Sequence, residues 1–199
     1  MSKRAGAVSA ETRQSILDAA REEFSLHGFQ GSSLRRICAG AGVTTGAIYF
    51  FFSGKDELFE TVMAGVTEPF LAFMRQHYAA ERRGMAPGDR QQGDLEISRT
   101  LIDFYFQNRQ VWDILLNHLN HPAVQRFLEG FVEESTDHYA FLLEQVHPVD
   151  RFAIHQFVHM QTDSMLTLIS HDFCREEMLR HSAACTRMLQ GAFQALLKE

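Results

Sequence analysis

The stretch that decides the fold is GFQGSSLRRICAGAGVTTGAIYFFFSGKDEL, which runs from Gly28 to Leu58. Short segments with helical spacing of apolar residues alternate here with glycine turns, which predicts short helices. Gly42 follows one segment, where a left-handed residue ends a helix, and Thr44 precedes the next segment as a cap. Two short helices joined by a tight turn form a helix-turn-helix, the arrangement whose second helix enters the major groove of DNA.

Helical spacing also dominates the rest of the chain, and no run shows the period-2 alternation of a strand. We therefore predict an all-α protein: an N-terminal three-helix helix-turn-helix domain followed by a larger C-terminal helical domain, about nine helices together. A kink is expected near Pro69 of the fourth helix. The predicted helices cover residues 9–28, 33–40, 44–51, 56–82, 95–109, 110–119, 122–146, 149–171 and 175–198, with a loop at 84–94.

Charge divides the chain into two parts with opposite sign. Residues 1–56 carry seven Lys/Arg and five Asp/Glu, whereas residues 57–199 carry 12 and 20, within a chain of net charge −6. Only the first part is suited to meet phosphates. We expect residues 1–56 to form the DNA-binding domain and residues 57–199 to form a separate helical domain.

Composition excludes several other classes of protein. The longest apolar stretches, such as 47–52, are far shorter than the ~18 residues that a membrane helix needs, so no membrane partner is expected. No secretory signal is visible, which predicts a cytoplasmic protein. The three cysteines form no CxxC pair, and no zinc ligand set or cofactor motif is present, so we expect no metal and no cofactor.

The stretch from Gly28 to Leu58 resembles the tetracycline-repressor (TetR) family of bacterial repressors. The shared features are a glycine and an aromatic after the first helix, a Ser/Thr-capped second helix, the run AGV-[ST]-x-G, an apolar residue before Tyr49, and a Lys-acid-acid-Leu helix start. The close match extends from the first helix to the fourth. The resemblance implies a dimeric transcriptional regulator whose third helix reads a double-stranded DNA operator.

The resemblance also implies DNA contacts for individual residues. Thr44, Thr45 and Gly46 would meet bases or backbone, and methyl groups such as that of Ala47 suit thymine. Tyr49 and Lys55 would each meet a phosphate. The predicted DNA-binding residues are Ser33, Arg35, Arg36, Thr44, Thr45, Gly46, Ala47, Tyr49, Phe50 and Lys55.

Each of these roles has a plainer alternative. Tyr49 taken alone is typical of a half-buried core aromatic, and Lys55 taken alone of a solvated charge. The family often carries His or a second Tyr where this chain has Phe50 and Phe51, whose rings cannot donate to phosphate. Arg35 and Arg36 either take over those contacts or are simple surface charges.

The second domain is rich in aromatic residues, because 12 of the 17 Phe follow residue 57. Such a set lines an apolar pocket or fills an ordinary core. Since the resembled family is generally inducible, we expect a small hydrophobic effector, neutral or cationic, with His118 and Gln161 as further polar candidates. The predicted ligand-binding residues are Phe104, Trp112, Phe127, Phe131, His155, Phe157, His159 and Met160.

His155 and His159 are four residues apart and share a helix face, a spacing that can bind a metal. The sequence places no third ligand beside them, and so no metal site is predicted.

The last two predicted helices carry apolar stripes at helical spacing. Two helices from each subunit would form a four-helix bundle, so we expect a homodimer. The alternative is that both stripes are buried within one chain. The predicted interface residues are Met165, Leu168, Met188, Leu189 and Phe193.

Together these patterns predict a ligand-responsive DNA-binding transcriptional regulator, in the first instance a repressor that releases a near-palindromic operator when the effector binds. The alternative is a helical nucleic-acid-binding adaptor without a small-molecule effector. An enzyme is disfavoured, because no Gly-rich phosphate loop, GxSxG motif or Cys/His constellation is found.

Overall fold

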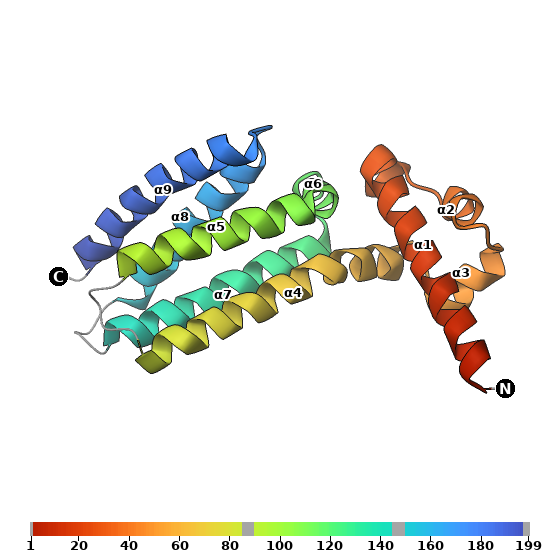
Figure 1. The fold of residues 1–199 in the computed structure, drawn as a ribbon, viewed down its shortest axis with the longest axis horizontal. Helices are drawn as coiled ribbons and strands as arrows, with labels where there is room; N and C mark the ends of the chain where they lie inside the picture. The colour runs from red at the N-terminus through yellow and green to blue at the C-terminus, as the bar shows by residue number, and fades with distance from the viewer. Residues whose placement is uncertain (1, 85–89, 145–149, 197–199) are drawn as a thin grey trace. The chain divides into compact units, whose positions relative to one another are not determined.

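The computed structural model describes residues 2–84, 90–144 and 150–196, and every regular element in these ranges is an α-helix (Figure 1). This confirms the predicted fold class. The helices are α1 (Ser2–Gly31), α2 (Leu34–Ala41), α3 (Thr45–Phe51), α4 (Lys55–Gly84), α5 (Arg90–Gln107), α6 (Arg109–Leu116), α7 (Pro122–Glu144), α8 (Arg151–Ile169) and α9 (Arg175–Leu196). None of these helices is long and apolar enough to cross a membrane.

Two predicted boundaries were wrong. The first helix begins at Ser2 and not near Ser9. The predicted loop at 84–94 overlaps the start of α5, which begins at Arg90 because Arg and Gln are good helix formers and a single glycine, Gly93, is tolerated after them. Residues 85–89 of that loop, and the ends of the helices predicted at 122–146 and 149–171 that fall within 145–149, lie outside the described residues.

The chain folds into two compact units. The first comprises Met1–Pro69 and Gln110–Val124, and the second comprises Phe70–Arg109 and Gln125–Glu199. The segment that contains most of α6 therefore belongs with the first three helices, although it lies between two stretches of the second unit in sequence. The domain boundary predicted at residue 56 stays a prediction; the compact units divide α4 at Pro69 instead, where the proline supplies no N–H to the helix.

The core of the first unit is built from one face of each short helix. Phe24 of α1 and Phe59 of α4 meet edge to face, with ring centroids 5.1 Å apart, and Phe29 contacts Phe59 at the same distance. Ile37 of α2 and Ile48 of α3 are fully buried. Each short helix thus has one apolar face that holds it in place, and its other face stays exposed.

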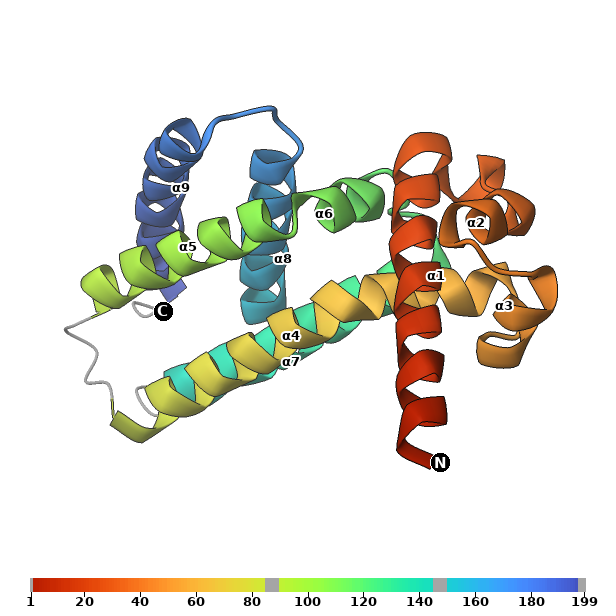
Figure 2. The same ribbon diagram turned by 45° about the vertical axis from the view of Figure 1, so that its right-hand side comes forward.

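In the second unit α4 and α7 run side by side (Figures 1 and 2). An ion pair joins Arg75 to Glu134, and the Tyr78 hydroxyl lies 2.7 Å from that of Ser135. Burial raises the pKa of Tyr78 to about 12, a shift that the hydrogen bond with Ser135 opposes. Between α4 and α7 the second unit therefore contains one buried polar pair, Tyr78 and Ser135, and one exposed ion pair.

The helices α8 and α9 complete the core of the second unit, and α9 also packs along α5. Phe157 of α8 contacts the rings of Tyr139 and Phe193, at centroid distances of 5.3 and 5.6 Å. At the start of α8, the Asp150 carboxylate accepts the N–H of Phe152 at 2.9 Å, which caps the helix.

Candidate functional site

The helix-turn-helix is formed by α2, a glycine turn and α3. Gly42 ends α2 in the left-handed region with φ 66°, and the Val43 N–H donates to the Cys38 carbonyl at 3.0 Å. The turn predicted at Gly42 is confirmed. Thr44 precedes α3 in an extended conformation, and its side chain makes no capping hydrogen bond. Its hydroxyl is therefore not used to stabilise its own helix.

The outer face of α3 is unusual for a short helix because it exposes aromatic rings. Ile48 faces the core, whereas Tyr49 is 59% exposed and Phe50 is 77% exposed. The rings of Phe50 and Phe51 meet edge to face at 4.9 Å. Thr45 and Gly46 are also exposed. The sequence alternative in which Tyr49 is a half-buried core residue is wrong, because its ring lies on the solvent face.

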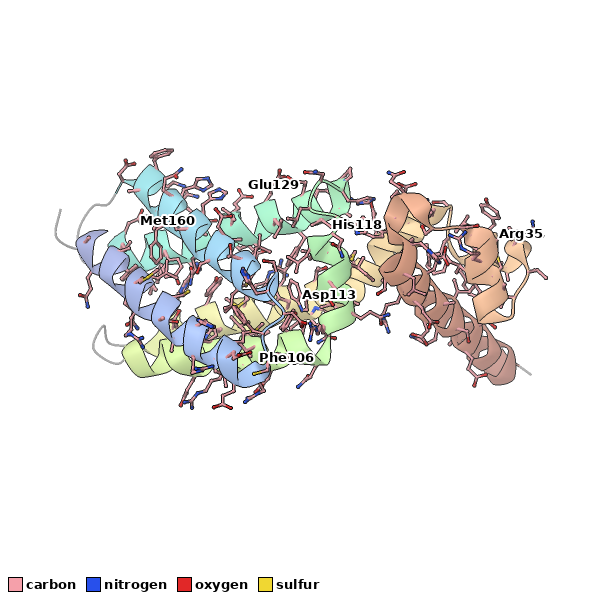
Figure 3. All side chains as sticks on the ribbon, turned by 90° about the horizontal axis from the view of Figure 1, so that it is seen from above. Arg35, Phe106, Asp113, His118, Glu129 and Met160 are labelled. Carbon is pink, nitrogen blue, oxygen red and sulfur yellow. The ribbon has the colours of Figure 1, made fainter. Side chains whose placement is uncertain are left out.

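The two arginines of α2 have different environments. Arg36 donates from Nε to the buried carboxylate of Glu23 at 2.8 Å, and Glu23 also accepts the Ser33 N–H at 2.9 Å. Burial opposes ionisation of Glu23, but these hydrogen bonds outweigh it and lower the pKa below its ordinary value of 4.5. Arg36 and the Ser33 amide thus hold α2 against α1. Arg35 is exposed and has no ion pair within the described ranges (Figure 3).

Lys55 closes the junction between α1 and α2. Its Nζ donates to the carbonyls of Phe29 at 2.6 Å and Ser32 at 3.3 Å, and it lies 4.6 Å from the centre of the Phe29 ring. An ammonium group has three N–H bonds, so a phosphate contact at Lys55 requires the third. The sequence alternative of a fully solvated charge is wrong, because the group is half-buried.

The turn after α6, at residues 117–120, also contacts the junction between α1 and α2. The Phe29 N–H donates to Nε2 of His118 at 2.7 Å, and Nδ1 of His118 lies 2.6 Å from the Ile114 carbonyl. His121 packs its ring on Phe29 and Phe59, at 4.7 and 4.4 Å. His118 was expected to orient a ligand, and the structure shows it bonded to backbone of α1 instead. No local pattern signals this contact, because the partners are 89 residues apart.

The predicted ligand-binding residues do not form one cluster. Phe127 and Phe131 pack around Phe70 with ring centroids 5.9 and 5.4 Å from it, and Phe157 is buried in the core described above. Phe104 is half-buried at 6.1 Å from Phe70. Trp112 belongs to the first unit. A core role, the alternative for each of these aromatics, fits Phe127, Phe131 and Phe157.

A groove of about 780 Å³ runs between α7 and α8 within the second unit. Its lining contains His155 and His159 from the predicted set, and Met160 is exposed outside it (Figure 3). The apolar members are Leu128, Val132, Phe152 and Leu166; the polar and charged members are Gln125, Glu129, Glu133, Thr136, Arg151, His155, His159, Thr162 and Asp163.

The groove is acidic. It contains three carboxylates, those of Glu129, Glu133 and Asp163, and its single arginine, Arg151, is paired with Asp137. The Nε2 atoms of His155 and His159 lie 3.1 Å apart, so one ring donates to the other. No group of three or more metal-binding side chains is found among the described residues.

The predicted dimer residues divide into two kinds. Met188 is 71% exposed, and Met165 and Leu168 are half-buried. Phe193 is buried, and Leu189 packs against the same core cluster. For Phe193 the structure supports the alternative of burial within one chain, because its ring contacts Tyr139 and Phe157.

Comparison with known proteins covers the two parts of the chain unequally. Residues 16–62 match the family of bacterial regulatory proteins of the tetR type. The HTH-type transcriptional regulator SrpR of Pseudomonas putida is 42% identical over 69 residues, which are 35% of this chain and 32% of that protein. The match thus spans about a third of the relative's length.

Solved structures match over most of the chain at low identity. A transcriptional regulator from Aquifex aeolicus superposes with a TM-score of 0.64 at 17% identity, covering 89% of this chain and 98% of that one. The multidrug binding protein EbrR, complexed with malachite green, gives a TM-score of 0.63 at 18% identity over 90% and 96%. These likenesses show the fold of both units, and the local match shows the helix-turn-helix. Residues 16–62 therefore carry a domain of the tetR type of bacterial regulatory proteins, and the chain as a whole shares the fold of these solved structures.

Proposed function

We propose that this protein is a DNA-binding transcriptional regulator, a repressor that leaves its operator when a small molecule binds. The exposed face of α3 is the observation that carries the proposal. Polar and aromatic side chains from Thr44 to Phe50 stand outward while Ile48 alone anchors the helix in the core. A helix held from behind by one apolar face can enter a major groove without losing its packing.

In this proposal α3 reads bases and α2 supports it beside the DNA backbone. Arg35 is the cation of α2 that is positioned for a phosphate, because Arg36 is bonded to Glu23. Tyr49 presents its hydroxyl to a second phosphate, and Phe50 presents a ring to thymine methyls. Lys55 and Ser33 act mainly by holding the junction behind these helices.

Selection of bound sequences from random DNA tests the DNA-binding role. We expect a near-palindromic site whose two halves lie about one helical turn apart, as a symmetric dimer requires. Arg35→Ala should weaken binding and lower the salt slope by about one. Arg99→Ala, which removes an exposed arginine of the second unit, is the matched control. Failure to enrich any sequence would contradict the DNA-binding role.

For the effector we propose the groove between α7 and α8. Its volume of about 780 Å³ suits a drug-sized molecule. Apolar side chains and three carboxylates line it, which favours a hydrophobic ligand that is neutral or positively charged. The similar fold of EbrR, a multidrug binding protein, supports a ligand of broad chemical type.

Thermal unfolding with two dyes tests this assignment. The cationic dye crystal violet should raise the Tm, and the anionic dye fluorescein should not. Glu133→Gln should reduce the shift, whereas Glu68→Gln, an exposed carboxylate of the first unit, should leave it unchanged. The same dye should release the operator. Operator binding that no dye alters, with no shift in Tm, would favour the adaptor without an effector.

The proposal also includes a homodimer through α8 and α9. Met188 offers exposed apolar surface on α9, with Met165 and Leu168 partly available on α8. Light scattering at micromolar concentration tests it, since a monomer there would exclude a stable dimer.

A further inference from the structure

The backbone N–H and carbonyl of Phe29 join three parts of the first unit. Its N–H donates to Nε2 of His118 at 2.7 Å, in the turn after α6. Its carbonyl accepts from Ser32 Oγ and from Lys55 Nζ, each at 2.6 Å. The backbone of one residue at the end of α1 is therefore fixed from the segment between α1 and α2, from α4 and from the turn after α6.

The backbone is shaped for this contact. Gly28, the residue before Phe29, lies within α1 but has φ 65° and ψ 174°, so the helix is kinked at this residue. A Cβ atom added at Gly28 would lie 3.3 Å from Nε2 of His118, tighter than most real Cβ contacts. The glycine of the sequence signature thus provides both the turn and the space for the imidazole.

The two hydrogen bonds of His118 determine its protonation. The Phe29 N–H can only donate, so Nε2 must be an unprotonated acceptor. The Ile114 carbonyl can only accept, so Nδ1 must carry the proton that it donates. Both bonds exist together only for the neutral ring. A protonated imidazole has an N–H at Nε2 and cannot accept from Phe29.

We propose that neutral His118 is a positioning residue that holds the helix-turn-helix in its operator-binding arrangement, and that protonating His118 weakens operator binding. The inference rests on the proposed DNA-binding function. Loss of the hydrogen bond between Phe29 and His118 frees the end of α1. Because the segment Ser32–Ser33, which leads into α2, begins three residues after Phe29, this change reaches the start of the helix-turn-helix. His118 acts through Phe29 and touches no DNA.

Other charged groups surround the junction. Lys55 of α4 binds the carbonyl of the same residue, so a second cation at the N–H of Phe29 adds repulsion. His121, in the same turn, packs on Phe29 and Phe59. On α1, His27 lies 3.8 Å from the carboxylate of Glu23. His121 and His27 are further imidazoles close to this junction, and the test must separate their protonation from that of His118.

The test is operator affinity from pH 8 to pH 5.5 at constant salt, for the full chain and three variants. His118→Gln can accept from Phe29 through Oε1 but does not titrate. His118→Ala removes the acceptor. His121→Gln is the matched control. We expect parental affinity to fall as histidines protonate, by up to about tenfold per pH unit for each site coupled to binding.

His118→Gln should bind within about threefold of the parent at pH 8 and lose less affinity at pH 5.5. His118→Ala should bind at least about tenfold more weakly at pH 8 with an equally shallow profile. His121→Gln should keep the parental profile. Parental pH dependence in His118→Gln, or parental affinity in His118→Ala at pH 8, overturns the inference while the DNA-binding function stands. Absence of DNA binding by every protein at pH 8 would instead reject the proposed function, and this inference with it.

Discussion

Substitutions at Phe193 and Met188 separate the core of the second unit from the proposed dimer interface. Phe193 is 8% exposed, and its ring centroid lies 5.6 Å from that of Phe157 and 5.7 Å from that of Tyr139. Phe193→Ala leaves a cavity between these rings, and such truncations cost about 3–5 kcal/mol of unfolding free energy. Both partners belong to the same chain, so this loss is expected whatever the state of assembly.

Met188 should behave in the opposite way. Its side chain is 71% exposed in the single chain, so Met188→Asp should change the stability of a monomer by no more than about 0.5 kcal/mol. In an apolar interface, however, the unpaired carboxylate costs several kcal/mol and should dissociate the dimer.

Urea denaturation at several protein concentrations, combined with light scattering, measures both effects. A dimer makes the parental midpoint depend on concentration. We expect the midpoint of Met188→Asp to be independent of protein concentration. The midpoint of Phe193→Ala should be lower than that of the parent but should still depend on protein concentration. The reasoning is refuted if Phe193→Ala yields a monomer of unchanged stability, because Phe193 would then lie in the interface and not in the core.

Further predictions concern backbone strain and ionisation. Both Gly28 and Gly42 have positive φ, so alanine at either position should lower the free energy of unfolding by roughly 1–2 kcal/mol in urea denaturation. Gly28→Ala should cost more than Gly42→Ala, because only the Cβ at position 28 meets another side chain, that of His118. The lowered pKa of Glu23 contributes stability that is present above about pH 4.5 and is lost as the pH falls. Glu23→Gln should therefore be less stable than the parent at pH 7, and the difference in stability should shrink toward pH 3, as followed by the circular dichroism of the helices. Burial raises the pKa of Tyr78 to about 12, so the stability due to its neutral phenol is present below pH 10 and is lost as the pH rises toward 12. Ultraviolet titration of Tyr78→Phe should lack a late phenolate that the parent shows, and identical curves near pH 12 would contradict the burial.

The local features of the helix-turn-helix could be predicted from sequence because their causes are local. Gly42 ends α2 in the left-handed region, as the run AGV indicates, and Ile48 is the buried residue of a short helix that follows Thr44. Turn chemistry and helical spacing act over a few residues, so all the residues that determine these features are neighbours in the sequence. The all-α fold and most helix boundaries could be predicted for the same reason.

Contacts across the chain were decided by the tertiary structure alone. Helical spacing indicates that one face is apolar, but it does not indicate what covers that face. The sequence therefore predicts a ligand pocket for Phe157 and a dimer interface for Phe193, whereas the two rings contact each other in one core. The bond from Phe29 to His118 joins residues 89 positions apart, and it exists because folding brings the turn after α6 to the end of α1. The sequence determines which groups are available for such a bond, and only packing determines which of them meet.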